Sequence, residues 1–352
     1  MIGLDDAEEL RAGDPGRMLD AVASLPQHCR QGYAFGLRTA GLPTGDGITA
    51  VTFCGMGGSA VAGDVLRTLY RDRLIVPVDV NRSPELPAYC GPHTLVVCSS
   101  YSGETAETLA CFRRALERGS RVIAVTSGGT LERLATEAGL GVVKVPGGFP
   151  PRAAFGYIAF AVLGAIETTG LLPSLAADLE ETTSELDELV GRLGPDVPRE
   201  NNPAKELAWV VGDRVPVIWG AEGFAAVAAA RWKTQFNENA KVPAWSSSLP
   251  ELDHNEVVGW RSPTAESAFV IALRHEGEHP DVAVRFPVSL DIAREAGAVT
   301  DEVWGAGRTS MARLLSLVLM GDYSTVYHAL AHGVDPTPIL AIDRLKAALA
   351  EA

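Results

Sequence analysis

Short apolar runs recur along most of this 352-residue chain, and each is followed by a small-residue turn and an amphipathic stretch. Strands that alternate with helices in this way are typical of βαβ units, whose strands form a parallel sheet. The runs of the first half lie at residues 48–54, 75–80, 94–98, 122–126 and 141–145. Those of the second half lie at 215–219, 268–273 and 284–288. The pattern therefore predicts an α/β fold.

The two series of runs open in the same way, which indicates a diverged internal duplication. A hydrophobic strand, a glycine-bearing turn and an alanine-rich helix follow one another at 51–60 and again at 215–224. We therefore expect two doubly wound, flavodoxin-like domains in tandem, with ligands at the carboxyl ends of their strands. The predicted division is a helical segment at 1–45, a first domain at 46–175, a linker helix at 176–204 and a second domain at 205–352.

The charge balance excludes some partners. The chain carries 44 acidic and 30 basic residues, a net charge of −14, and no run of Lys and Arg is longer than a pair. Such a chain repels nucleic acid and anionic membrane, and we expect neither as a partner. A phosphate-bearing ligand must then be held by local donors, because the overall field opposes it.

The cysteines and histidines give no sign of a metal or a disulfide framework. The five cysteines include no C-x-x-C pair, which fits a reducing cytosol. The N-terminus has no signal-peptide pattern, and the longest apolar stretch, 153–166, is too short to span a bilayer. The pair His328 and His332 has no third ligand in its motif, and His275 and His279 resemble a polar turn. We therefore expect a cytoplasmic protein without a bound metal.

Two turns form a candidate phosphate site. The first, G-M-G-G-S at 55–59, combines glycines that let the backbone approach a ligand with a following helix N-terminus. Alone it is equally compatible with a plain strand-to-helix turn, and Ala60 weakens a dinucleotide fingerprint. The second, S-S-Y-S-G-E-T at 99–105, offers more hydroxyl groups between a strand and a helix than helix capping requires.

Together these two motifs resemble the signature of SIS domains, which bind phosphosugars. Glu104 departs from the asparagine or aspartate expected at its position. The resemblance implies a set of phosphate-binding residues: Gly58, Ser59, Ser100, Ser102 and Thr105.

Three further segments carry groups suited to proton transfer. Arg152 follows two prolines, which fix the chain's entry into a predicted helix. Glu238 lies between two asparagines near the end of another helix, and His254 lies among amides and acids. Aldose–ketose isomerisation uses such groups: a carboxylate that moves a proton between C1 and C2, a histidine for ring opening, and a guanidinium that holds the enediolate.

The segments P-P-R-A-A-F-G-Y, N-E-N-A-K-V-P and L-P-E-L-D-H-N-E-V-V-G-W resemble those of the bifunctional phosphoglucose/phosphomannose isomerases. This resemblance runs from about residue 53 to the C-terminus. It implies Glu238 as the C1/C2 base, His254 as the ring-opening residue and Arg152 as the enediolate stabiliser. Lys346 matches a lysine near the family's C-terminus, and Thr337 is a candidate counterpart of an alcohol linked to epimer choice.

The resemblance also implies the reaction and the assembly. We expect interconversion of fructose 6-phosphate with glucose 6-phosphate and mannose 6-phosphate through a cis-enediol(ate), without metal or cofactor. We also expect a homodimer in which the histidine reaches the partner's site.

Several alternatives stay open at this point. The chain could isomerise another phosphosugar, be a metal-dependent mannose-phosphate isomerase, or be a SIS-type sensor, although 1–45 is too acidic and short for a DNA-binding module. Among single residues, Lys346 could be a solvated helix residue and Lys241 could pair with an acid. Glu251 and Glu256 are expected to be structural acceptors.

Overall fold

The computed structural model describes residues 3–350, and the fold divides into two compact units. Unit 2 holds Ser24–Asp187 and Ala306–Leu315. Unit 1 holds Glu188–Gly305 together with the described residues before Ser24 and after Leu315. The sequence predicts a division of the chain into four consecutive segments, and that division stays a prediction.

Unit 2 is built on a five-stranded parallel sheet with the order β2-β1-β3-β4-β5. This is the flavodoxin-like strand order, so the predicted doubly wound α/β architecture is confirmed. The strands are β1 (Ala50–Cys54), β2 (Val78–Asn81), β3 (Thr94–Ser99), β4 (Arg121–Thr126) and β5 (Val142–Lys144). The central strand β3 is buried along its whole length, as expected for a strand with helices on both faces.

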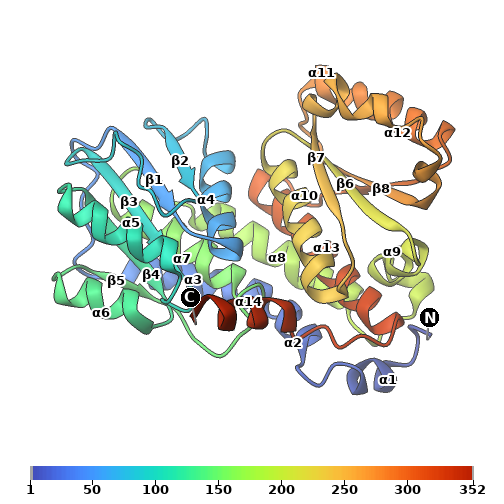
Figure 1. Ribbon diagram of the computed structural model, residues 1–352, viewed down its shortest axis with the longest axis horizontal. Coiled ribbons are helices and arrows are strands. Elements are labelled where there is room, and N and C mark those ends of the chain that lie inside the picture. Colours follow the sequence, from blue (N-terminus) through green and yellow to red (C-terminus); the bar gives the residue numbers. More distant parts are fainter. Residues whose placement is uncertain (1–2, 351–352) are drawn as a thin grey trace. The chain divides into compact units, whose positions relative to one another are not determined.

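Helices cover both faces of this sheet (Figure 1). Side chains of α5 (Ala106–Glu117) and α6 (Gly129–Glu137) share one hydrophobic cluster with alternate residues of β1, β3 and β4. On the other face, α4 (Gly57–Leu69) packs on β1, and α7 (Phe155–Thr168) packs on β4 and β5. Helix α3 (Leu25–Arg38), which precedes the first strand in the chain, lies along α7. Nearly all of α7 is buried, which explains why its sequence is apolar all round.

Unit 1 is built on a four-stranded parallel sheet with the order β7-β6-β8-β9. The strands are β6 (Val215–Ala221), β7 (Trp245–Leu249), β8 (Ala268–Arg274) and β9 (Val299–Trp304). Helix α9 (Pro203–Val211) precedes β6, and α10 (Phe224–Gln235) follows it. Helices α11 (Pro280–Ala283) and α12 (Arg285–Glu295) lie between β8 and β9. This order repeats that of β2-β1-β3-β4, so the two sheets share the topology that the duplication predicts.

One predicted strand is wrong. Residues 284–288 follow α11 and form the beginning of α12, not a strand. Val284, Phe286 and Val288 alternate as in a strand, but Phe286, Leu290 and Ala293 recur at helical spacing and are buried together. Pro287 is tolerated because it lies in the first turn of the helix, where its missing N–H has no helical partner to lose.

Further helices complete the description. The N-terminal helices α1 (Ala7–Ala12) and α2 (Met18–Ala23) belong to unit 1. Helices α8 (Ala176–Leu193) and α13 (Ser310–Ala331) each run from one unit into the other, and α14 (Leu340–Ala350) follows in unit 1. Within residues 3–350, no helix combines the length and the apolar character that a membrane span requires.

Candidate functional site

The two predicted phosphate motifs lie side by side in unit 2, because Cys54 and Cys98 are register partners on the neighbouring strands β1 and β3. The first motif leads into α4, whose N-cap residue Met56 offers no side-chain acceptor to the first turn. The second leads into α5, whose N-cap residue Thr105 makes no capping bond either. Two helix N-termini without side-chain caps therefore face the same sheet edge, an arrangement that favours an anion.

The hydroxyl groups of the second motif are organised around Ser100, which is buried at the end of β3. Its Oγ lies 2.8 Å from the Thr105 Oγ1 and accepts the Gly103 N–H at 3.1 Å. Ser102 is exposed, and its Oγ accepts the Glu104 N–H. Ser59 is half-buried in the first turn of α4. The predicted phosphate ligands thus lie in one region of unit 2.

Glu104, the departure from the SIS pattern, has a structural partner. Its Oε1 accepts the N–H of Thr130 at 2.7 Å, in the first turn of α6. A carboxylate at a helix N-terminus stabilises that helix. The acidic side chain is therefore engaged by α6.

Arg152 is 3% exposed and lies in the turn that leads into α7. This turn passes close to α4: a Cβ at Gly58 would lie 3.6 Å from the Pro151 carbonyl oxygen and 3.9 Å from the Arg152 Cα. The structure therefore brings Arg152 beside Gly58, as a shared site requires. The burial of Arg152 agrees with the fixed position that the two preceding prolines predict.

Two residues that the sequence did not single out support the arginine turn. The Tyr101 hydroxyl donates to the Pro146 carbonyl and accepts the Phe149 N–H. Burial raises the pKa of Tyr101, which keeps the donor protonated. The His28 ring stacks on Tyr157 at 4.1 Å between centroids.

His28 also reaches the arginine turn itself. Its ring meets Phe149 edge-on, and its imidazole lies beside the main chain of Ala153, the residue after Arg152. Burial lowers the pKa of His28 to about 4, so it is neutral at physiological pH. Sequence alone offered no signal for this contact, because His28 precedes Arg152 by more than a hundred residues.

Glu238 lies in unit 1 on a π-helical turn, Phe236–Ala240, that extends α10. Such turns often occur at functional sites, because they change the direction in which side chains leave a helix. The two flanking asparagines hold the turn: Asn237 Nδ2 donates to the Val242 carbonyl, and Asn239 Nδ2 donates to the Thr325 Oγ1 on α13. Glu238 itself is half-buried.

Helix α10 is fixed to α13 by buried polar contacts. Arg231 and Asp322 form an ion pair with an Nη2–Oδ2 distance of 2.7 Å, and both side chains are buried. Gln235 also donates to Asp322, and the Trp232 indole donates to the Leu317 carbonyl. A buried, fully bonded network of this kind costs several kcal/mol to break on one side, roughly 3–5. The helix that carries Glu238 therefore has a defined position.

His254 is exposed at the end of a short 3-10 turn, Glu251–His254. Its neighbours anchor the loop: Asp253 accepts from the Ser289 hydroxyl, and Glu256 accepts from the Trp219 indole at 2.9 Å. Glu251 accepts from the Asn255 amide. Glu251 and Glu256 are thus hydrogen-bond acceptors, as expected.

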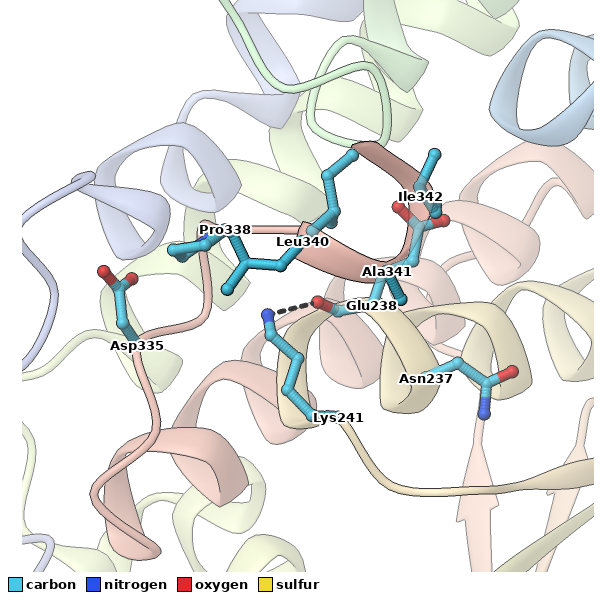
Figure 2. Close-up of a pocket in the computed structure, with 9 residues that line it drawn as sticks. Asn237, Glu238, Lys241, Asp335, Pro338, Leu340, Ala341 and Ile342 are labelled. Atoms are coloured by element: carbon cyan, nitrogen blue, oxygen red, sulfur yellow. Dashed lines mark hydrogen bonds between the residues drawn. The ribbon is translucent and has the colours of Figure 1, made fainter. Parts of the chain in front are cut away.

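A pocket of about 490 Å³ lies next to Glu238 (Figure 2). It is lined by Asn237, Glu238 and Lys241 from the π-turn and its end, and by Asp335 and residues 338–342 from the C-terminal segment. Lys346 lies on α14, is exposed and does not line this pocket. The Thr337 hydroxyl oxygen is buried and does not line it either.

Lys241, which could pair with an acid, is bound to main-chain atoms of its own turn and of the C-terminal segment. Its Nζ donates to three main-chain carbonyl oxygens, those of Glu238, Asn239 and Pro336.

The histidine pair at the end of α13 has protein partners: His328 lies on the helix, and His332 follows its last residue. His328 Nε2 lies 2.9 Å from the Gly212 carbonyl oxygen, and burial lowers the pKa of His328 to about 4. His332 Nδ1 lies 2.8 Å from the His328 carbonyl oxygen. Across residues 3–350, no group of three His, Cys, Asp or Glu side chains is placed to hold a metal ion.

Comparison with known proteins places these motifs in one family. Residues 200–349 match the family model of the bacterial phospho-glucose isomerase C-terminal SIS domain. The chain is 38% identical over 336 residues to a bifunctional phosphoglucose/phosphomannose isomerase of Caldicellulosiruptor bescii, covering 95% of this chain and 99% of that protein. A protein of the same name from Aquifex aeolicus is 35% identical, with 84% and 89% covered. A D-glucosamine-6-phosphate 4-epimerase of Sulfolobus acidocaldarius is 32% identical over a shorter region, 59% of this chain and 62% of that protein.

Solved structures agree on the fold. A hypothetical protein from Thermus thermophilus aligns with a TM-score of 0.74 at 17% identity, covering 98% of this chain and 93% of that one. A glucose-6-phosphate isomerase like protein from the same organism aligns with a TM-score of 0.64 at 20% identity, covering 98% and 99%. At such identities the structures establish the fold, and the full-length sequence matches establish the family. The chain therefore belongs to the bifunctional phosphoglucose/phosphomannose isomerases.

Proposed function

We propose that this protein interconverts fructose 6-phosphate with glucose 6-phosphate and mannose 6-phosphate. The observation that carries the proposal is the placement of Glu238, a half-buried carboxylate on a fixed π-turn beside a pocket, in a chain similar over 95% of its length to such an isomerase. In the proposed mechanism Glu238 removes the proton from C2 of the aldose, or from C1 of the ketose. Returning that proton to the other carbon of the cis-enediol(ate) completes the isomerisation.

The remaining assignments follow from the chemistry of each group. Ser59, Ser100, Ser102 and Thr105, with Gly58, supply neutral donors and helix N-termini for the phosphate dianion. Arg152 is a buried guanidinium, suited to hold the negative charge that develops on the enediolate oxygens. His254, exposed on an anchored loop, opens the sugar ring, and Lys346 contributes to the site from α14.

The assembly and the compartment belong to the same proposal. We propose a homodimer in which His254 serves the neighbouring subunit, which agrees with the exposure of this side chain. A reducing cytoplasm agrees with five cysteines that are all free and buried.

A second candidate substrate class calls for a direct comparison. The similarity to a glucosamine 6-phosphate epimerase indicates that closely related chains act on other phosphosugars. Glucosamine 6-phosphate is therefore the most informative alternative substrate to offer.

The proposal is tested by a coupled assay on purified protein with EDTA present. Fructose 6-phosphate is offered, glucose 6-phosphate and mannose 6-phosphate are measured separately, and glucosamine 6-phosphate is tested in parallel. We expect both products from the wild type. Glu238→Gln should lose isomerisation but still bind fructose 6-phosphate, because the phosphate contacts are untouched. Normal turnover by Glu238→Gln would refute the mechanism, and turnover of glucosamine 6-phosphate alone would refute the substrate assignment.

A further inference from the structure

The ammonium group of Lys241 joins two segments that are almost a hundred residues apart in the chain. Its Nζ lies 2.6 Å from the Glu238 carbonyl oxygen and 3.3 Å from that of Asn239, both on the π-turn. It also lies 2.8 Å from the carbonyl oxygen of Pro336. An ammonium carries three N–H donors, so it can bind acceptors on both segments at once.

The two joined segments supply the lining of the pocket beside Glu238. The π-turn contributes Asn237 and Glu238, and the C-terminal segment contributes Asp335 and residues 338–342. Figure 2 shows the Lys241 side chain extending to the main-chain oxygen of Glu238 at this pocket. The Lys241 side chain therefore helps to set the separation between the Glu238 turn and the C-terminal segment.

The backbone of Lys241 supports a role for its side chain. Lys241 ends the π-turn in the left-handed conformation, with φ at 61°, a region that favours glycine. A lysine there carries a conformational cost that glycine would avoid. The bonds of its ammonium to three carbonyl oxygens give a physical reason for lysine at this position.

We infer that Lys241 is a positioning residue that holds the Glu238 turn and the C-terminal segment in register. This inference rests on the proposed function, in which Glu238 moves the proton. Lys241 acts through the main chain of Glu238 and takes no part in proton transfer. It also ties Pro336 down next to Thr337, so the same contact sets where this threonine lies relative to Glu238.

A second contact holds the C-terminal segment independently. Gly16, in the loop between α1 and α2, lies against Thr337: a Cβ at position 16 would be 2.0 Å from the Thr337 Oγ1. Any side chain at position 16 must therefore displace the threonine or its segment. Gly16→Ala thus perturbs the segment while leaving the Lys241 ammonium intact.

The test measures kcat, KM and the ratio of the two products for four variants. Lys241→Met removes the ammonium and should lower kcat by about 10- to 100-fold, because small displacements of a catalytic group have effects of this size. KM for fructose 6-phosphate should change little, because the phosphate donors are untouched. Lys241→Arg keeps donors for the carbonyl oxygens and should restore much of the lost kcat. Lys233 lies on α10 and does not line the pocket, so Lys233→Met is the matched control and should behave as wild type.

Gly16→Ala should lower kcat and change the ratio of glucose 6-phosphate to mannose 6-phosphate. Unchanged kcat in Lys241→Met would overturn the inference. A second result would also overturn it: a loss of kcat that Lys241→Arg does not restore and that is accompanied by a matching loss of thermal stability. A general structural role of Lys241 would then explain the loss of kcat. Glu238→Gln separates the two claims. If that variant turns over normally, the proposed base is wrong, whereas an inactive Glu238→Gln beside a normal Lys241→Met refutes only the positioning role.

Discussion

At the scale of single residues, several charged and polar side chains near the proposed site are bound to main-chain atoms. Lys241 donates to carbonyl oxygens, Glu104 accepts from an α6 N–H, and Asn237 donates to the Val242 carbonyl. Such contacts fix the backbone more than they fix other side chains. The turns that carry Glu238 and the phosphate motif are therefore held in shape before any substrate arrives.

His28 leads to a prediction about pH. Its folded-state pKa is about 4, below the ordinary value of 6.5, because burial disfavours the charged ring. Between these values the unfolded chain binds the proton and the folded chain does not, so folding stability falls as pH drops from 6.5 towards 4. At about pH 5 the loss attributable to His28 is about 2 kcal/mol.

Urea unfolding at neutral pH and near pH 5 measures this loss, and His28→Phe is the matched variant, because it keeps a ring against Tyr157. The variant should show a smaller loss of stability on acidification than the wild type. His328, with a similarly lowered pKa, keeps its own contribution in both proteins. An equal loss in the two proteins would contradict the role assigned to His28.

Short motifs predict candidate residues for the chemistry of the site, but not the contacts that support them. Ser59, Ser100 and Arg152 are assigned from such motifs, and their roles stay predictions. His28 acts on the Arg152 turn through the packing of α3 on α7, a contact between helices far apart in the chain. No local spacing contains that information, and the same holds for the contact of Lys241 with Pro336.

At the scale of elements, the sequence predicted the two central strands of the unit 1 sheet and missed the two at its edges. β7 and β9 are the two edge strands of the unit 1 sheet. The first contains three consecutive serines, and the second contains two acidic residues. Edge strands bury less of their surface, so their sequences need less apolar character. The central strands, buried on both faces, were found because burial forces a continuous apolar run.

The packing of α3 on α7 depends on a close approach, which gives a second prediction. A Cβ at Gly36 of α3 would lie 2.4 Å from the Ala161 carbonyl oxygen and 2.5 Å from the Ala165 nitrogen, both main-chain atoms of α7. Gly36→Ala should therefore force the helices apart and lower the melting temperature. Overpacking of this kind costs about 1–3 kcal/mol.

Gly191 provides the control, because it is also helical but has nothing within 4 Å of its Cβ position. Gly191→Ala should raise stability by about 0.5–1 kcal/mol through helix propensity alone. Thermal unfolding of both variants measures these changes in stability. A stabilising Gly36→Ala would show that the helices can separate without cost.

At the scale of the whole molecule, the aromatic and sulfur residues are distributed unequally between the two units. All six tryptophans lie in unit 1, at positions 209, 219, 232, 245, 260 and 304. All five cysteines lie in unit 2, and each is free and buried. Tryptophan fluorescence therefore reports on unit 1, and thiol labelling reports on unit 2.

This distribution allows a test of cooperativity. Because α8 and α13 each contribute residues to both units, we expect the units to unfold together. The native thiols should react slowly, since they are buried and burial raises the pKa of Cys29. In a urea titration the fluorescence change and the gain of thiol reactivity should have the same midpoint. Separate midpoints would show that the shared helices do not couple the units.

The route of the chain between the units has a consequence during translation. Residues 3–23 of unit 1 are synthesised before unit 2, but their partners begin only at Glu188. Unit 2 emerges next and lacks Ala306–Leu315, whose residues Arg308 and Thr309 donate to the Glu181 carboxylate of α8. Neither unit is complete until synthesis has passed residue 315. The nascent chain must therefore keep both unfinished units from aggregating until this segment has been made, and a stop codon before this point would leave two unfinished units instead of one finished domain.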